Sequence, residues 1–378
     1  MSSLQKQNKF AKLGQGRADE GGQNRDTLTG RREYGTLAGT MRAALATAFG
    51  KPLEIRELPI PEPGPGELLI RLQACGVCHS DLDVRTGLTA PDESTLPLIL
   101  GHEGVGIVVA RGPGCSTIEE GARVGLPWMH DTCGQCRECL TGHESFCPGH
   151  RGHGFHVNGG FADYAVVKEA YTAVIPDAID SVAAAPLLCA GVTAWGAVRK
   201  AELAPGRTCA VFGIGGLGQY GIQLARAAGA RVIAVDANQD KLEIARELGA
   251  DHVLLAADDP GHRIRDLGGA DACINFAPSN RVWDAILTGI NPRGWVISVA
   301  QVPEPVPLNL ESLTFNGIRI TGSAVGSRQE LRDLLRLAAE SDIGIAIETI
   351  SLSQADEALD RLARGEVDGR QVIDFALD

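Results

Sequence analysis

The stretch that most constrains the fold of this chain is a glycine-rich turn, Gly213-Ile-Gly-Gly-Leu-Gly218. A buried apolar run, Thr208–Phe212, precedes it, and a helical pattern over residues 219–228 follows it. A second apolar run over 231–235 then ends in Asp236. Strand, glycine turn, helix and strand in this order predict a βαβ unit, and hence a parallel sheet with helices on both faces.

The same turn predicts a dinucleotide site. Gly213 would permit the tight turn, Gly215 would let a pyrophosphate approach backbone donors at the helix start, and Gly218 would let helix and strand pack closely. Asp236 can accept hydrogen bonds from a ribose 2′-hydroxyl but would repel a 2′-phosphate. Because no arginine stands at 237 or 238, the pattern favours NAD over NADP.

Four cysteines lie close together in the first half of the chain, with two, two and seven residues between them. They are Cys133, Cys136, Cys139 and Cys147. Four thiolates can close a tetrahedral zinc shell that has no open position, whereas iron-sulfur motifs use other spacings. The spacing therefore predicts a structural zinc lobe over about residues 130–150.

A second cluster precedes this lobe. Cys75-Gly-Val-Cys-His-Ser-Asp81 and Gly101-His-Glu103 bring thiolate, imidazole and carboxylate groups together. A catalytic zinc takes three such ligands and keeps one open position, which makes Cys78 and His102 candidates. Taken alone, these cysteines could equally fill core space, and so could Cys189 in an apolar helical stretch over 183–199.

Composition argues against several functions. The 378 residues include 35 basic and 47 acidic ones, a net charge of −12, which argues against nucleic-acid binding. No apolar run is long enough to span a membrane.

Residues 1–40 are polar and are expected to form a flexible extension. From residue 41 short apolar runs between Gly and Pro predict an irregular β domain.

Taken together, these motifs resemble the zinc-dependent medium-chain alcohol dehydrogenases, and among them the bacterial primary-alcohol type. The resemblance covers about residues 41–378. It is carried by the following stretches: CGVCHSDL (75–82), GHEGVG (101–106), CGQCRECLTGHESFC (133–147), LLCAGVTAWGA (187–197), GIGGLG (213–218) and GRQVIDF (369–375).

The resemblance implies two zinc ions per chain, one catalytic and one structural, together with NAD. It assigns Cys78, His102 and Cys189 as ligands of the catalytic zinc, and Glu103 as a carboxylate that approaches the metal during ligand exchange. It makes Ser80 the hydroxyl that takes the alcohol's proton and Asp81 the carboxylate that orients His102. Its remaining assignments fall into four groups. His79, Lys241 and Arg370 would contact the cofactor's phosphates or ribose, and Thr193 and Leu217 would lie beside the nicotinamide. Trp128 would line the substrate pocket, and the four lobe cysteines would bind the structural zinc.

The resemblance also implies a domain plan. A GroES-like, β-rich catalytic domain would comprise 41–190 and 325–378, and a Rossmann domain with a doubly wound parallel sheet would comprise 191–324. The expected protein is a cytoplasmic homotetramer, or a dimer, that acts on a small alcohol or aldehyde and binds neither nucleic acid nor membrane. The natural dimer contact would be an exposed edge strand near Trp295–Ala300.

The expected activity is reversible hydride transfer between a primary or secondary alcohol and NAD. Two alternatives stay open at this point: a reductase of α,β-unsaturated aldehydes or ketones, and a non-catalytic zinc-bearing relative. One position departs from the family pattern, because Asp83 stands where many relatives have a proton-relay histidine. An ordinary carboxyl group, with a pKa of about 3.9, is a weak base near neutral pH.

Overall fold

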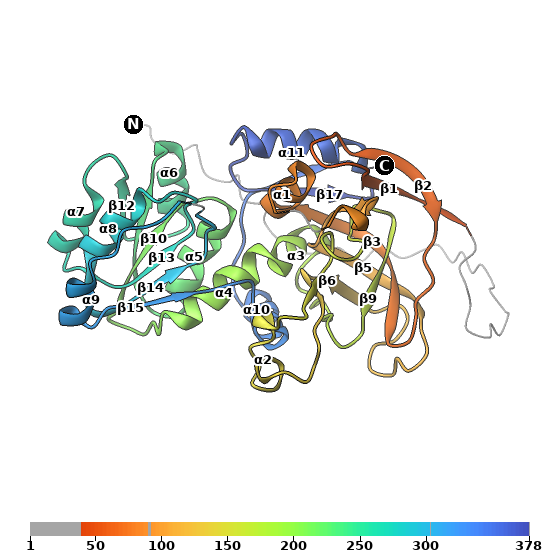
Figure 1. The fold of residues 1–378 in the computed structure, drawn as a ribbon, viewed down its shortest axis with the longest axis horizontal. Coiled ribbons are helices and arrows are strands. Elements are labelled where there is room, and N and C mark those ends of the chain that lie inside the picture. The colour runs from red at the N-terminus through yellow and green to blue at the C-terminus, as the bar shows by residue number, and fades with distance from the viewer. Residues whose placement is uncertain (1–38, 90–91, 303, 378) are drawn as a thin grey trace, which may run out of the picture. The chain divides into compact units, whose positions relative to one another are not determined.

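The computed structural model describes residues 39–89, 92–302 and 304–377 (Figure 1). The predicted extension lies outside these residues except for its last two. The first described strand begins at Thr40, and the extension stays a prediction.

A parallel sheet of six strands occupies the second half of the chain, in the order β12-β11-β10-β13-β14-β15. Alternate residues of each strand enter two different cores. In β10, Cys209 and Val211 pack with helix α5, whereas Ala210 and Phe212 pack with α7 and α8. The sheet is therefore covered on both faces, which confirms the predicted doubly wound fold.

The bounds of this region are β10 Thr208–Phe212, α5 Gly216–Ala227, β11 Arg231–Asp236, α6 Gln239–Glu247, β12 His252–Leu255, α7 Pro260–Asp266, β13 Ala270–Asn275, α8 Val282–Gly289, β14 Ile290–Ser298, α9 Leu310–Asn316 and β15 Arg319–Gly322. The βαβ unit around the glycine turn forms as predicted.

The predicted edge strand near Trp295–Ala300 is wrong. Strand β14 lies between β13 and β15, so β15 is the edge of the sheet. The Arg319 guanidinium of β15 lies 4.1 Å from the centre of the Trp295 ring, a cation–π contact that covers the indole. Strand β15 is short and partly polar, so its sequence does not indicate that it pairs with the apolar strand β14.

The rest of the chain forms mostly antiparallel sheets. Strands β16-β17-β3-β5-β6 form one sheet, with β9 also paired to β3, while β2-β1-β4 and β7-β8 form two smaller sheets. Their bounds are β1 Thr40–Ala46, β2 Glu54–Pro59, β3 Glu67–Val77, β4 Leu98–Ile99, β5 Gly104–Arg111, β6 Arg123–Leu126, β7 Met129–Asp131, β8 Arg151–Gly152, β9 Tyr164–Lys168, β16 Ile347–Ile350 and β17 Arg370–Asp374.

The C-terminal strand β17 pairs with β3, and Gln371 stands opposite Val77. Residues far apart in the sequence thus share one sheet. The exact domain limits at 190, 191, 324 and 325 remain a prediction.

Short helices connect these strands. They are α1 His79–Thr86, η1 Glu93–Thr95, α2 Arg137–Leu140, η2 Glu144–Phe146, α3 Ser181–Ala184, η3 Ala185–Leu188, α4 Ala190–Lys200, α10 Arg328–Glu340, η4 Leu352–Gln354 and α11 Ala355–Ala363. The single helix expected over 183–199 is wrong, because the chain changes to a 3₁₀ turn at Ala185–Leu188 and leaves helical geometry at Cys189. Pro186 lacks the amide hydrogen that a continuous helix would use.

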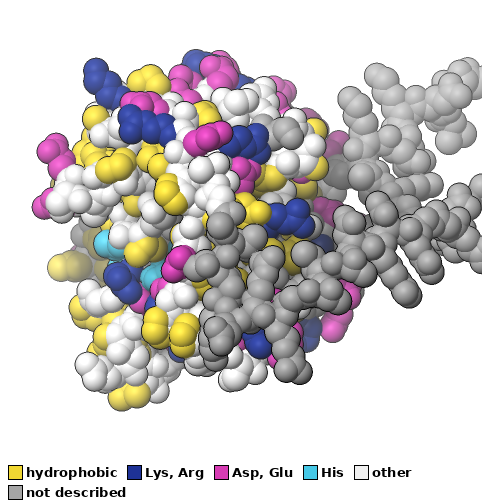
Figure 2. Space-filling view, turned by 90° about the vertical axis from the view of Figure 1, so that its right-hand side faces the viewer, with side chains coloured by type: hydrophobic (Ala, Val, Ile, Leu, Met, Phe, Trp, Pro, Cys, Tyr) yellow, Lys and Arg dark blue, Asp and Glu magenta, His cyan; other side chains and the backbone are white. Residues whose placement is uncertain are grey.

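Among the described residues, no single helix is long and apolar enough to cross a membrane. The two helical segments Ser181–Leu188 and Ala190–Lys200 are together long and apolar enough to cross a membrane, but the chain bends by 50° between them. Most side chains of α4 are buried in the protein core. On the face drawn in Figure 2, basic and acidic side chains are interspersed among the described residues.

The cysteine-rich loop is fastened to α10 by a buried carboxylate. Oε1 of Glu144 accepts hydrogen bonds from the backbone N and from Nε of Arg328, at 2.9 and 2.7 Å. The Arg328 guanidinium also lies 4.4 Å from the centre of the Tyr171 ring and donates to the Ala170 carbonyl. One carboxylate thus fixes the loop to a helix far along the chain.

Replacing Glu144 by Ala should therefore destabilise the fold. We expect a loss of about 1–3 kcal/mol in the free energy of unfolding, since two donors of Arg328 lose their acceptor while the guanidinium stays partly exposed to water. Chemical denaturation would measure it. Glu243→Ala, which removes an exposed pair with Arg246, should change stability by less than about 0.5 kcal/mol. Equal effects of the two substitutions would contradict this account.

Candidate active site

Four potential ligands converge although they are far apart in the sequence. Cys78 is the N-cap of α1, directly after β3, while His102 and Glu103 lie between β4 and β5, and Cys189 occupies the break between η3 and α4. Their ligand atoms all lie within 4.8 Å of one another, and all four residues are buried. The structure thus brings together every residue predicted for the catalytic metal.

The two cysteines of this cluster share a side-chain hydrogen bond. A hydrogen bond from Cys189 lowers the pKa of Cys78 well below its ordinary value, and Arg370 and His102 act in the same direction. The same hydrogen bond and burial raise the pKa of Cys189. A thiolate is the form of cysteine that binds metals.

Asp81 faces the imidazole of His102. Its carboxylate accepts hydrogen bonds from the backbone N of Cys78 and of Gly101, both at 2.9 Å. Its Oδ1 lies 3.2 Å from Nδ1 of His102. Burial opposes the charged imidazole, but Asp81 raises the pKa of His102 above its ordinary value. This is the carboxylate–histidine arrangement that orients metal ligands.

Glu103 forms a buried ion pair with Arg370 of β17. Burial raises the pKa of Glu103, and the positive charge of Arg370 opposes that rise. Its second oxygen, Oε2, has no hydrogen-bond partner. Arg370 is only 4% exposed, so this guanidinium is buried beside the cluster and is not a surface charge.

These residues fit a zinc ion. Nε2 of His102 and Oε2 of Glu103 are buried without hydrogen-bond partners, which is costly unless a ligand satisfies them. Two sulfurs and one imidazole are the donors that a catalytic zinc prefers, and they leave a fourth position for a small molecule.

The residues after Cys78 lie at the start of α1. The hydroxyl oxygen of Ser80 is 4.0 Å from Sγ of Cys78, and its side chain is partly exposed. His79 is exposed, and Asp83 is half-buried one turn further along the helix. Partial burial raises the pKa of Asp83 above its ordinary value, and His79 opposes this effect.

The second cysteine group also forms a compact cluster. Sγ of Cys133 lies 3.6 Å from that of Cys147 and 3.9 Å from that of Cys139, which is 3.5 Å from that of Cys136. Backbone N–H groups of Gln135 and Cys136 lower the pKa of Cys133 to about 6. These four sulfurs fit a closed tetrahedral zinc site.

The glycine turn has the geometry of a phosphate cradle. Gly213 has φ +87°, which favours glycine, and a Cβ on Gly218 would lie 1.9 Å from the Gly213 carbonyl oxygen. A Cβ on Gly215 would meet nothing within 4 Å. Gly215 is the N-cap of the 12-residue helix α5 and offers no side-chain acceptor, so the helix donors there are open to an anion.

The other predicted cofactor residues lie on β11, α4, α5 and α6, apart from His79 and Arg370. Asp236 ends β11, where its carboxylate accepts hydrogen bonds from the backbone N of Ile214 at 2.6 Å and of Asn238 at 2.9 Å. Leu217 is the second residue of α5, and Lys241 lies in α6. Thr193 is buried one turn after Cys189. Asp236 therefore also holds the turn in place.

Trp128 lies against the metal cluster. Its ring centre is 4.9 Å from that of His102, and the two rings meet edge to face. No role was assigned from the sequence to the buried His153. Its Nδ1 lies 2.8 Å from the Pro127 carbonyl oxygen and its Nε2 lies 3.3 Å from the Val166 carbonyl oxygen, while its backbone N donates to the Trp128 carbonyl at 2.9 Å. Burial lowers the pKa of His153 to about 3, so it is neutral.

Two further residues were missed by sequence reasoning. Thr132 accepts a hydrogen bond from Sγ of Cys139 at 3.3 Å and contacts the hydroxyl of Tyr171 at 2.7 Å. Glu144 fastens the same loop, as described above. Their position inside the cysteine spacing was the available signal, but hydroxyl and carboxyl groups are common in loops.

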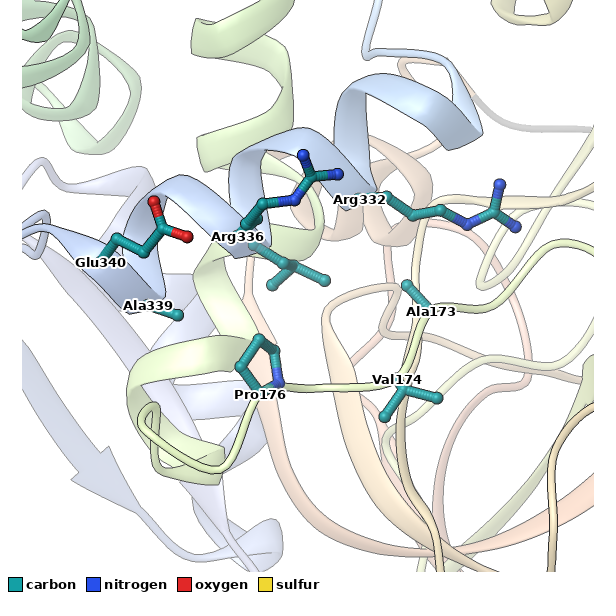
Figure 3. A pocket seen from close by; sticks show the side chains of 8 residues that line it. Ala173, Val174, Pro176, Arg332, Arg336, Ala339 and Glu340 are labelled. Carbon is teal, nitrogen blue, oxygen red and sulfur yellow. The ribbon is translucent and has the colours of Figure 1, made fainter.

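A pocket of about 410 Å³ lies elsewhere, between α10 and the segment 173–176 (Figure 3). Apolar side chains line it together with Arg332, Arg336 and Glu340. None of the metal-ligand or glycine-turn residues contributes to it, so we do not place the substrate there.

Comparison with known proteins agrees with this geometry. Residues 64–177 match the alcohol dehydrogenase GroES-like domain, and residues 216–340 match the zinc-binding dehydrogenase domain. An alcohol dehydrogenase of Geobacillus stearothermophilus is 39% identical over 335 residues, which are 88% of this chain and 99% of the relative.

Two solved structures are also similar. Acetophenone reductase from Geotrichum candidum, in complex with NAD, has a TM-score of 0.81 and 29% identity, covering 91% of this chain and 100% of that chain. A putative zinc-binding dehydrogenase from Sinorhizobium meliloti, bound to NADP, has a TM-score of 0.81 and 30% identity, covering 89% and 99%. These matches confirm the predicted GroES-like and nucleotide-binding fold. The chain therefore belongs to the zinc-dependent medium-chain alcohol dehydrogenase family.

Proposed function

We propose that the protein is a zinc- and NAD-dependent alcohol dehydrogenase that converts a primary or secondary alcohol reversibly to the aldehyde or ketone. The convergence of the Cys78, His102 and Cys189 ligand atoms within 4.8 Å carries this proposal. We also propose that the enzyme is a cytoplasmic homotetramer and that each chain holds two zinc ions.

When bound, zinc lowers the pKa of an alcohol hydroxyl and nicotinamide accepts a hydride. Cys78, His102 and Cys189 would hold the metal, with Asp81 fixing the orientation of His102. The hydroxyl of Ser80 would accept the proton of the alcohol. Glu103 would neutralise Arg370 and could approach the metal during ligand exchange.

The cofactor would lie along the glycine turn. Gly215 leaves room for the pyrophosphate at the start of α5, and His79, Lys241 and Arg370 would contact the phosphates or the ribose. Thr193 and Leu217 would flank the nicotinamide. Relatives of known structure hold NAD in one case and NADP in another, so the preference for NAD rests on the negative charge of Asp236 near the ribose.

Two alternatives are less well supported. A reductase of activated carbon–carbon double bonds does not need the complete ligand set, and a non-catalytic relative needs neither that set nor Ser80. An enal substrate would separate the first alternative, because loss of the alkene and loss of the aldehyde give different products.

We expect the purified enzyme to oxidise simple alcohols at least about tenfold better with NAD than with NADP, measured as kcat/KM, because Asp236 repels the 2′-phosphate.

His102→Gln should lower kcat/KM at least about 1,000-fold, since the metal loses a ligand while side-chain volume is nearly kept. His262→Gln, a substitution at an exposed histidine, is the matched control. The proposal fails if the wild type oxidises no alcohol, or if the His102 variant keeps near-normal activity.

Asp83 should accept the proton at the outer end of the relay. Its raised pKa means that the basic form is lost at a higher pH than for an ordinary carboxyl group, so wild-type alcohol oxidation should fall as pH decreases through that pKa. Asp83→Asn should be about tenfold slower at neutral pH and should lack this decline. Asp177→Asn, at an exposed carboxylate, should leave the pH profile unchanged. Identical profiles for wild type and Asp83→Asn would exclude the role.

A further inference from the structure

Helix α5 is joined to the segment before Arg370 by one buried side chain, that of Gln219. This glutamine follows the last glycine of the turn and is 1% exposed. Its Nε2 donates a hydrogen bond to the backbone carbonyl of Asp368 at 2.6 Å. Asp368 lies two residues before Arg370 in the sequence. The bond therefore links the helix that starts at the glycine turn to the base of the strand that carries Arg370.

The same face of α5 also meets Arg370 itself. Gly216 lies three residues before Gln219, and residues three apart share one face of a helix. A Cβ on Gly216 would lie 2.9 Å from Cδ of Arg370 and 3.5 Å from the carbonyl oxygen of Gly369. The start of α5 thus rests on residues 368–370 at two points, by close contact at Gly216 and by a hydrogen bond at Gln219.

The backbone of this segment is held by a neighbouring strand end as well. The backbone N of Arg370 donates to the carbonyl of Ala346 at 3.0 Å, and a Cβ on Gly369 would lie 2.1 Å from the same oxygen. The backbone therefore has little room to shift. These contacts set the direction in which the Arg370 side chain leaves the strand, so that its guanidinium pairs with Glu103 while its aliphatic part lies against Gly216.

Stability alone does not explain a glutamine at this position. Within the described part of the chain, Oε1 of Gln219 is buried without a hydrogen-bond partner, and an unpaired buried acceptor costs free energy. A methionine of similar length would avoid this cost, but it could not donate to Asp368. The amide is therefore better explained by the position that it gives to the segment before Arg370.

We propose that Gln219 is a positioning residue, which holds Arg370 between the glycine turn and Glu103 and thereby strengthens binding of the dinucleotide. This inference rests on the proposed function. The pyrophosphate would lie at the Gly215 end of α5, and Arg370 would contact the phosphates or the ribose. The bond from Gln219 keeps these two contacts at a fixed separation. Groups that are already in place lose less freedom when a ligand binds, so the bond favours binding.

The test is the dissociation constant of NADH, measured by fluorescence on the purified protein without any alcohol. Gln219→Met should raise it about 3- to 10-fold, the loss expected for one hydrogen bond. Gln219→Asn keeps the amide but is one methylene shorter, so it should cause a similar rise. Gln223→Met is the matched control, because Gln223 lies one turn further along α5 and bonds to both backbone groups of Gly344, at 2.8 and 3.1 Å. It should leave the dissociation constant within about twofold of wild type.

A double-mutant cycle with Arg370→Lys shows whether Gln219 acts through Arg370. Residues that act through one another have non-additive effects, so Gln219→Met should raise the dissociation constant less than about twofold in the Arg370→Lys background. An unchanged constant in either folded Gln219 variant, an equal rise in Gln223→Met, or additive effects in the cycle would each overturn the inference. A wild type that does not bind NADH would instead overturn the proposed function itself.

Discussion

One buried carboxylate, Asp81, determines the geometry of the site. It is 1% exposed and accepts hydrogen bonds from the backbone of Cys78 and of Gly101, while it also faces the imidazole of His102. A carboxylate in this environment is tolerated only because these donors surround it. In doing so, it fixes two segments of the chain that each carry a metal ligand. The direction of the imidazole and the position of the thiolate depend on the same group.

The buried pair of Glu103 and Arg370 extends this arrangement to the nucleotide-binding region. Arg370 lies on β17, which pairs with β3, the strand that leads to Cys78. Its side chain also lies against the glycine turn, where a Cβ on Gly216 would be 2.9 Å from Cδ of Arg370. One arginine therefore contacts both the metal-ligand cluster and the start of α5. Because Arg370 lies on β17, this one strand can help to position both the metal ligands and the cofactor.

Much of this organisation was predictable from the sequence, because it depends on local patterns. The strand, glycine turn and helix around Gly213 and the regular spacing after Cys133 each have one simple structural solution. The break at Cys189 was not predictable from apolar periodicity, which continues through Pro186, and β15 was too short and polar to be assigned as the edge. Contacts such as Glu144 with Arg328 and Gln219 with Asp368 join residues distant in sequence or ordinary in type, so no local signal announces them.

A metal ion held by Cys78, His102 and Cys189 is central to the proposed activity, and anomalous diffraction at the zinc absorption edge tests for it most directly. Crystals of the purified protein should show two zinc peaks per chain. One should lie among the two sulfurs and Nε2 of His102, and the other among the four sulfurs of the cysteine-rich loop. A peak in the loop alone, or a metal at the first site that is not bound by His102, would contradict the account.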